Sequence, residues 1–419
     1  MGLECGECGL HIRLGCPARL RSRLPKAPMP LLPVTALTTL LHVYIGLRLL
    51  SALGTFPYAV PLLLAALLVS AVTMPLPFIG LRSKARPPAD AWKWVGLISM
   101  GWFSSMFVLT AVRDVGLLLT WLLSLAGVAV DWPRLGAWSA VAVPTIATLT
   151  SLIGFFNARR TAGVVRLDVP MPNLPWSLHG FTIAQLSDIH VGPTIKRGYI
   201  QRIVDAVNQL DADVIAITGD LVDGSVPELR EHIAPLGGLR ARHGTFVVTG
   251  NHEYYAGAHA WIDELRRLGL RVLLNEHVLL GARNAKGAQT DEEVDASMLV
   301  LAGVTDFTAV HFDAAHASDP RASLDGAPAG ATTRVLLAHQ PRSAPAAAEA
   351  GFQLQLSGHT HGGQFFPWNL FVPLQQPFVA GLNKLGAMWV YVSRGTGYWG
   401  PPKRFGAPSE ITLLRLVRA

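Results

Sequence analysis

The stretch FTIAQLSDIH, residues 181–190, is an apolar run that ends in a serine, an aspartate and a histidine. A second run of the same kind, DVIAIT at residues 213–218, is followed by GDLVD at residues 219–223. Between them, residues 196–210 carry apolar side chains at helical spacing. The pattern predicts two parallel strands joined by a helix, the β-α-β unit of an α/β fold.

Three later apolar runs end in polar residues of the same chemical kinds. They are GTFVVT (244–249) before GNHE (250–253), TRVLLA (333–338) before HQP (339–341), and FQLQLS (352–357) before GHTHGG (358–363). In an α/β sheet, side chains at the carboxyl ends of the strands converge in one crevice. The five separated segments therefore predict a single compact site.

The side chains collected in this way are mainly carboxylate, amide and imidazole groups. They are Asp188, His190, Asp220, Asn251, His339, His359 and His361, with His252 alongside. This donor set suits manganese, iron, zinc or cobalt, whereas magnesium prefers oxygen ligands and water. Two cations close together need a shared anion, and we expect Asp220 to be that bridging carboxylate.

The ordered series DIH, GDLVD, GNHE, HQP and GHTH resembles the calcineurin-like metallophosphoesterase superfamily. The motif GHTHGGQ, together with SRGTG at residues 393–397, is more similar to the bacterial YkuE/YaeI-type branch of this superfamily. The resemblance covers residues 181–416. It implies a sandwich of two mixed β-sheets flanked by helices, and hydrolysis of a phosphate ester or diester.

The resemblance also implies two metal sites that share Asp220. One divalent ion (manganese, iron or zinc) would be held by Asp188, His190, Asp220 and His361, and the other by Asp220, Asn251, His339 and His359.

Further roles follow from the same resemblance. His252 would contact the substrate phosphate and protonate the leaving oxygen, a step that needs a nearby acid. Asp223 would orient a histidine or a water molecule. Asn251 would also face the substrate. Independently of the resemblance, Arg394 and Arg404 could bind phosphate, although surface ion pairs are an equally good interpretation.

The first part of the chain is much more apolar than the part that carries these motifs. The chain is 50% hydrophobic and 15% charged, with a mean hydropathy of +0.35, and the apolar stretches concentrate between residues 30 and 156. A membrane-spanning helix needs about 20 mainly apolar residues. Four regions satisfy this requirement: 31–53, 57–80, 93–126 and 136–156.

The third region contains Arg113 and Asp114, and it could be one long helix, a helix with a re-entrant piece, or two crossings. The pair could be functional within the membrane, or it could be structural. We expect four domains or segments along the chain: a basic leader (1–30), a transmembrane region of about four helices (31–158), a linker with a first strand (159–180), and the catalytic domain (181–419).

Lysine and arginine residues favour one topology. They concentrate in the leader, in the second connection (Arg82, Lys84, Arg86) and after the last apolar region (Arg159, Arg160, Arg166). Positively charged segments remain in the cytoplasm. Four crossings therefore predict an integral protein of a bacterial inner or plasma membrane, with the leader and the catalytic domain on the cytoplasmic side.

The cysteines of the leader and the net charge of the chain each allow two interpretations. Cys5, Cys8, His11 and Cys16 could hold zinc, but the second half of a zinc motif is missing, so an unstructured leader is the better interpretation. The net charge of +7 could indicate nucleic-acid binding, but its placement beside the apolar regions suits a topology signal better. We expect no nucleic-acid partner.

The leading hypothesis is hydrolysis of a membrane-associated phosphoester, such as a lipid or a cell-envelope metabolite. Two rivals are a membrane sensor or assembly protein with a structural metal site, and a nuclease. Residues 281–296 and 314–330 are expected to be surface loops that shape substrate access, and Trp368 and Trp399 to pack in the core or at the membrane-facing rim.

Overall fold

The computed structural model describes residues 31–79, 90–281 and 297–419. The predictions for the leader, for Arg82, Lys84 and Arg86, and for residues 282–296 lie outside these ranges. Within these ranges, the helices that precede the sheets are α1 (Leu31–Leu49), α2 (Ala59–Thr73), the short α3 (Leu76–Ile79), α4 (Asp90–Leu125) and α5 (Trp132–Arg159). Their surfaces carry many exposed leucine, valine and isoleucine side chains, as expected of helices that face lipid.

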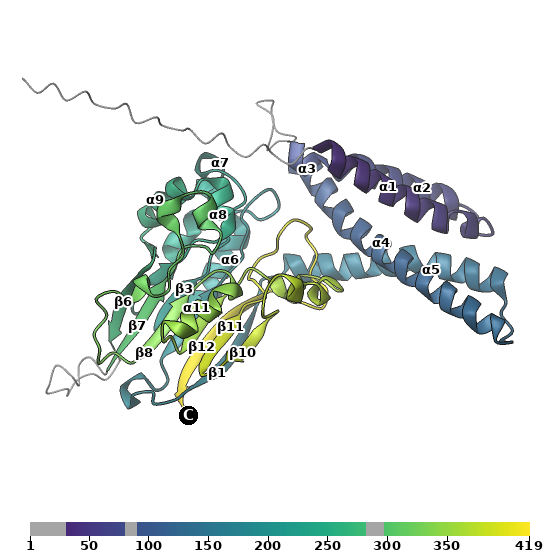
Figure 1. Ribbon diagram of the computed structural model, residues 1–419. Coiled ribbons are helices and arrows are strands. Elements are labelled where there is room, and N and C mark those ends of the chain that lie inside the picture. Colours follow the sequence, from purple (N-terminus) through teal and green to yellow (C-terminus); the bar gives the residue numbers. More distant parts are fainter. Residues whose placement is uncertain (1–30, 80–89, 282–296) are drawn as a thin grey trace, which may run out of the picture.

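Three candidate membrane spans occur in the described part of the chain. They begin at Thr35, Asp90 and Trp132, whereas α2, with 15 residues, is shorter than a standard span. The third apolar region forms the single continuous helix α4. In Figure 1 the turn between α1 and α2 and the turn between α4 and α5 both lie on the side away from the sheets.

Arg113 and Asp114 join three of these helices. Asp114 accepts hydrogen bonds from Tyr44 Oη (2.8 Å) and Arg48 Nε (2.8 Å) of α1. Arg113 donates to Ser139 Oγ of α5 (2.9 Å). Charged side chains at membrane depth are costly unless they are paired, and this network supplies the partners. Its contacts favour the structural interpretation of the pair.

The first sheet has the strand order β1-β12-β2-β3-β4-β5. Strands β2 to β5 are parallel, β12 is antiparallel to β2, and β1 pairs parallel with β12. The strands are β1 (Gly163–Met171), β2 (Thr182–Leu186), β3 (Val214–Ile217), β4 (Thr245–Val247), β5 (Arg271–Val272) and β12 (Glu410–Arg418).

The second sheet has the order β10-β11-β9-β8-β7-β6. Its central strands β7, β8, β9 and β11 are parallel, and β6 and β10 are antiparallel edge strands. The strands are β6 (Glu276–Gly281), β7 (Met298–Gly303), β8 (Thr333–Leu337), β9 (Leu354–Ser357), β10 (Gly381–Leu385) and β11 (Met388–Val392). Both sheets are mixed, so the predicted fold class is confirmed.

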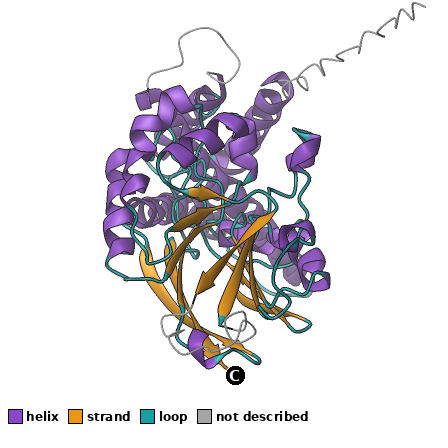
Figure 2. Ribbon diagram, turned by 90° about the vertical axis from the view of Figure 1, so that its left-hand side faces the viewer, coloured by secondary structure: helices purple, strands orange, loops and turns teal. Residues whose placement is uncertain are grey.

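The two sheets bury their facing sides against each other. Ile183, Val214 and Phe246 of the first sheet share one apolar cluster with Leu301 and Val335 of the second. Helices cover the outer faces, as Figure 2 shows with strands in orange and helices in purple. They are α6 (Arg197–Asn208), α7 (Val226–Ile233), α8 (Asn251–Ala256) and α9 (Ala258–Arg267) for the first sheet, and α11 (Ala344–Glu349) for the second.

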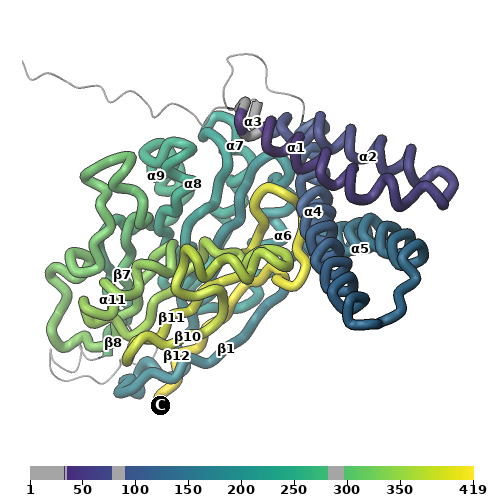
Figure 3. Tube along the Cα trace, turned by 45° about the vertical axis from the view of Figure 1, so that its right-hand side comes forward, coloured from purple at the N-terminus to yellow at the C-terminus, as the bar shows by residue number. Residues whose placement is uncertain are grey.

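The long helices contact the sheets through one late segment of the chain. Lys403 is buried, and its Nζ donates to Gly101 O of α4 and Ser151 Oγ of α5, each at 3.0 Å. The next residue, Arg404, donates its backbone N–H to Gly154 O (2.8 Å). Figure 3 shows this yellow segment beside α4 and α5. The contact fixes the sheets relative to the apolar helices.

Candidate metal centre

Five loops build the site, and each follows the carboxyl end of a parallel strand. They come after β2, β3 and β4 of the first sheet and after β8 and β9 of the second. Five side chains of the predicted site stand on left-handed backbone, which is rare outside glycine: Asp188 (φ 52°), His190 (φ 56°), Asp220 (φ 52°), His359 (φ 71°) and His361 (φ 52°). Such strained residues concentrate at functional sites, because the surrounding structure must hold them.

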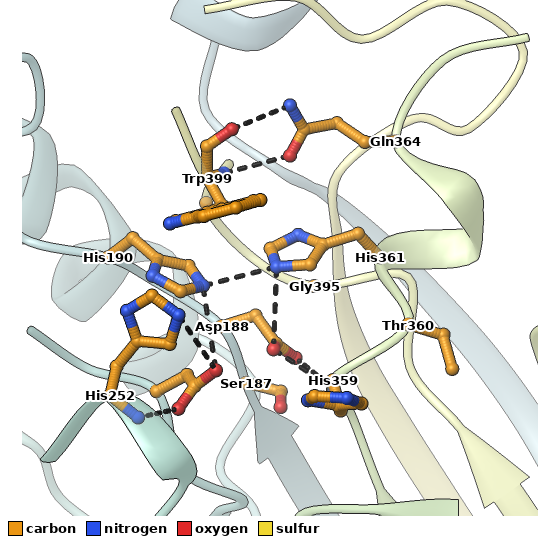
Figure 4. A network of polar contacts seen from close by, with 12 residues as sticks. Ser187, Asp188, His190, His252, His359, Thr360, His361, Gln364, Gly395 and Trp399 are labelled. Atoms are coloured by element: carbon orange, nitrogen blue, oxygen red, sulfur yellow. Dashed lines mark hydrogen bonds and ion pairs between the residues drawn. The ribbon is translucent and has the colours of Figure 1, made fainter. Parts of the chain in front are cut away.

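The first group of donors consists of Asp188, His190 and His361, all buried. His190 Nε2 lies 3.1 Å from His361 Nε2, and His361 Nε2 lies 3.6 Å from Asp188 Oδ1. Asp220 Oδ2 is 3.9 Å from His190 Nε2. Figure 4 shows Asp188, His190 and His361 pointing toward one another, although they come from loops of both sheets.

The second group surrounds the same carboxylate. His339 Nε2 lies 3.1 Å from Asp220 Oδ2, 3.2 Å from Asn251 Oδ1 and 3.1 Å from His359 Nδ1. Asp220 Oδ2 thus stands within 4 Å of a histidine of each group. All seven predicted ligand side chains lie together in one place.

The spacing of the nitrogen atoms fits a shared cation. Two imidazole nitrogens that each lie about 2.1 Å from one ion are roughly 3.0–3.4 Å apart. The two closest imidazole pairs, His190 with His361 and His339 with His359, both have a separation of 3.1 Å. The donor set therefore fits divalent metal ions.

Metal binding needs neutral imidazole, and two of the predicted ligands, His359 and His361, favour the neutral form. Burial lowers the pKa of His359 to about 3. Burial, and then the charge of Arg404, hold the pKa of His361 well below its usual range. His339 Nδ1 donates to Thr218 O (2.7 Å), which leaves Nε2 free to face Asp220.

His252 lies at the rim of this cluster and is joined to it by Asp223. Oδ1 of Asp223 accepts from Nδ1 of His190 (2.9 Å) and from Nδ1 of His252 (2.7 Å). Burial opposes ionisation of Asp223, but the two histidines outweigh it and lower its pKa to about 2. Burial would lower the pKa of His252, but Asp220 and Asp223 raise it to about 9. Both carboxylates therefore favour the protonated form of His252.

The backbone around the cluster leaves no room for larger residues at two glycines. A Cβ atom at Gly250 would contact Asp220 Oδ1, and one at Gly358 would contact Ser187 Oγ and Asp188 Oδ2. The main chain therefore approaches the carboxylates directly. His252 N donates to Asp220 Oδ1 (2.8 Å), and His359 N donates to Asp188 Oδ1 (3.0 Å).

Sequence reasoning did not assign a role to Glu253. Its buried carboxylate accepts backbone hydrogen bonds from Asp220 N (3.0 Å), Leu221 N (2.7 Å) and Gly250 N (2.7 Å). It thus ties the loop after β3 to the loop after β4. The sequence did contain a signal for this role, because Glu253 stands three residues after Gly250, and a glutamate three residues after an N-cap position is typical of a capping box.

Arg404 was considered only as a phosphate or ion-pair residue, but it is fully buried. Its guanidinium donates to His361 O (3.0 Å) and Gly397 O (3.1 Å), and Nη2 lies 3.1 Å from His361 Nδ1. Burial lowers the pKa of Arg404 to about 10. Arg404 therefore supports the loop that carries His361 and does not face solvent.

We predict that Arg404→Lys lowers the stability of the full chain by about 2–4 kcal/mol, because several buried carbonyl oxygens lose their donors. Thermal unfolding of the purified chain measures the effect. Arg415→Lys is the matched control, since Arg415 forms an exposed ion pair with Asp168 at 2.7 Å and little change is expected there. Equal midpoints for both variants would contradict the supporting role of Arg404.

Arg394 and Trp399 lie near the cluster with different partners. The guanidinium of Arg394 pairs with Glu410, Nη1 to Oε2 at 2.9 Å, and its role toward a substrate stays a prediction. Trp399 is 52% exposed, and the centroid of its ring lies 5.7 Å from that of the His252 ring. Figure 4 shows Trp399 above the histidines, so it faces the site and does not pack in the core.

Comparison with known proteins finds a matching family model and several similar chains. Residues 181–363 match the family model described as calcineurin-like phosphoesterase. A transmembrane protein with metallophosphoesterase domain from Bos taurus is 40% identical over 318 residues, which are 74% of this chain and 70% of that protein. The corresponding protein of Danio rerio is 39% identical, over 65% of this chain and 62% of its own length. The uncharacterized metallophosphoesterase YkuE of Bacillus subtilis is 28% identical, over 58% of this chain and 81% of its own.

Proposed function

The chain belongs to the calcineurin-like metallophosphoesterase family and is a phosphoric ester hydrolase, and on that premise we propose that it hydrolyses a membrane-associated phosphoester at a centre of two divalent metal ions. The observation that carries this proposal is the position of Asp220 Oδ2 between His190 and His339. One buried carboxylate oxygen between two sets of nitrogen and oxygen donors is the arrangement that a pair of cations requires.

We assign the ligands in two sets that share Asp220. Asp188, His190, Asp220 and His361 would hold one ion, and Asp220, Asn251, His339 and His359 the other. When bound, the ions supply Lewis acids for the phosphate oxygens and lower the pKa of a water molecule so that it can attack phosphorus. Manganese, iron and zinc all suit these ligands.

His252 and Asp223 are proposed to handle the proton of the leaving group. Asp223 holds His252 Nδ1 at 2.7 Å, which leaves Nε2 on the side of Asp220, 4.0 Å away. A protonated imidazole placed there can give a proton to an alkoxide as it leaves. Asn251, next to His252, is proposed to face the phosphate as well as the metal.

We propose that the chain is an integral membrane protein and that its catalytic domain, residues 181–419, lies on the cytoplasmic side. Four crossings by α1, α2, α4 and α5 would bring Leu31 and Arg159 to the same side of the membrane. The basic residues at the end of α5 and after it, namely Arg159, Arg160 and Arg166, favour the cytoplasm. Attachment beside the bilayer concentrates the enzyme near lipid-linked or envelope phosphoesters.

The test uses the purified full chain in detergent with Mn²⁺, Zn²⁺ or Fe²⁺ and two chromogenic substrates, an aryl phosphodiester and an aryl phosphomonoester. We expect metal-dependent turnover of at least one. No turnover with any of these ions would favour the rival interpretation, a sensor with a structural metal site. Cleavage of DNA or RNA that disappears in Asp220→Ala would favour a nuclease.

The ligand assignment predicts that Asn251→Ala and His359→Ala each lose one of two bound ions, because each removes a donor from the second set only. Elemental analysis of the purified full chain measures the ratio of metal to protein. His232→Ala is a suitable control, since His232 on α7 lies outside both donor groups. A normal metal content in the first two variants would refute the assignment.

A further inference from the structure

The segment 366–374, which we name the apolar loop, exposes an unusual amount of hydrophobic surface. It contains the short 3-10 turns Trp368–Leu370 and Val372–Leu374. Its exposed side chains are Phe366 (58%), Trp368 (38%), Leu370 (62%), Phe371 (52%) and Leu374 (80%). No charged residue occurs between positions 362 and 383. A contiguous apolar patch of this kind marks a surface with a partner.

The apolar loop lies directly beside the long helices. Trp368 Nε1 donates to Ser104 Oγ of α4 at 2.9 Å. The neighbouring residue Lys403 reaches Gly101 and Ser151, so the same region also contacts α5. Figures 1 and 3 both show the yellow-green apolar loop next to α4.

The depth of this contact follows from helix length. Ser104 lies 21 residues before Leu125, the end of α4, and Ser151 lies 19 residues after Trp132, the start of α5. At about 1.5 Å of rise per residue, each stretch measures roughly 30 Å, the thickness of the hydrocarbon core of a bilayer. When the turn between α4 and α5 is placed at the far boundary of the hydrocarbon core, Ser104 and its partner Trp368 come to lie at, or just inside, the boundary nearer to the sheets. Tryptophan is enriched at that level of membrane proteins.

The apolar loop is also continuous with the rim of the metal centre. Gln364, three residues after His361, exchanges two hydrogen bonds with the backbone of Trp399, each of 2.8 Å. The exposed Trp399 ring in turn lies beside His252. Figure 4 shows Gln364 and Trp399 together above the histidines. Gln364 therefore links the segment of the apolar loop to Trp399, the exposed aromatic residue beside the proposed proton donor.

We propose that the apolar loop inserts into the boundary between headgroups and acyl chains of the leaflet on the catalytic side, and that it opens the metal centre to phosphoesters carried by lipids. The occupant of this surface is the bilayer itself, because the loop continues the apolar surface of α4. The second half of the proposal rests on the proposed function. A lipid substrate keeps its chains in the leaflet while its phosphoester reaches Trp399 and His252.

The insertion is tested on the full chain in nanodiscs of phosphatidylcholine and phosphatidylglycerol. Cys5, Cys8 and Cys16 are replaced by serine, and Leu374→Cys is labelled with an environment-sensitive fluorophore. We expect spin-labelled lipids to quench the fluorescence of this label, and we expect dissolved iodide to quench it little. Trp176→Cys is the control, since Trp176 is 72% exposed and contacts Arg418 near the carboxyl terminus, away from the helices in Figure 1. Iodide quenching of the Leu374 label without lipid quenching would overturn the proposal, whether or not the chain is active.

The delivery of lipid substrates is tested with two aryl phosphodiesters that share a nitrophenolate leaving group and carry either a methyl or a hexadecyl group. In the double variant Leu370→Asp with Leu374→Asp, kcat/KM for the hexadecyl ester in vesicles is expected to fall about tenfold or more relative to the methyl ester in solution. An equal effect on both esters would contradict delivery through the apolar loop. If the unsubstituted chain hydrolyses neither ester, the proposed function is contradicted. The fluorescence experiment would still decide whether the apolar loop inserts into the membrane.

Discussion

Replacing Asp220 by asparagine is expected to remove both metal ions and to lower turnover by more than about a thousandfold. Oδ2 of Asp220 lies 3.1 Å from His339 Nε2 and 3.9 Å from His190 Nε2, so it faces a histidine nitrogen of each donor group. An amide has the same shape but no charge, and it cannot offset the repulsion between two neighbouring cations. Elemental analysis and kcat on an aryl phosphodiester measure the two effects.

The control for this substitution is Asp168→Asn, which removes an exposed carboxylate paired with Arg415 on the outer strands β1 and β12. Its metal content and turnover should match those of the unsubstituted chain. An Asp220→Asn protein that kept two ions per chain and near-normal turnover would show that the ions, if bound, do not share this carboxylate. The proposed chemistry would then have no basis.

His252→Gln is expected to keep both metal ions and to lower kcat by about 10²–10⁴-fold, because the substitution removes a proton donor and no ligand. Glutamine retains hydrogen-bonding capacity toward Asp223 but cannot transfer a proton at neutral pH. The loss should depend on the leaving group. An alkyl phosphodiester needs a proton on its leaving alkoxide and should lose most, whereas a nitrophenyl ester leaves as a stable anion and should lose little.

His259→Gln gives a matched histidine change on α9, where the side chain is exposed and pairs with Asp313 at 3.0 Å. It should leave both substrates unaffected. Two outcomes would count against the acid role of His252: loss of metal in His252→Gln, or equal losses for alkyl and nitrophenyl esters. The first would make His252 a ligand, and the second would limit it to phosphate binding.

Much of the fold could be read from the order of residues. The apolar runs at 213–218 and 333–338 became β3 (Val214–Ile217) and β8 (Thr333–Leu337), and the helical spacing at 196–210 became α6 (Arg197–Asn208). Local periodicity carries this information because strands and helices bury one side of the chain at fixed intervals. The second apolar region was less regular, since its helix ends at Thr73 and a short helix follows.

The identities of the candidate ligands also came from the sequence, because each follows an apolar run, but their metal roles stay predictions. The contacts that support them could not be read in this way. Arg404 reaches His361 across 43 positions of the chain, and Lys403 reaches Gly101 across 302. Neither contact has a local pattern, because each joins segments that are far apart in the chain.

The amino-acid order alone determined which strands carry carboxylate, amide and imidazole groups at their ends, and which segments are apolar enough for a membrane. Both are local properties, decided by side-chain chemistry at neighbouring positions. Only the tertiary structure decided that Asp220 stands between two groups of donors and that Trp368 of the apolar loop donates to Ser104 of α4. These positions arise from packing two sheets and two long helices together, and packing distances depend on residues far apart in the chain.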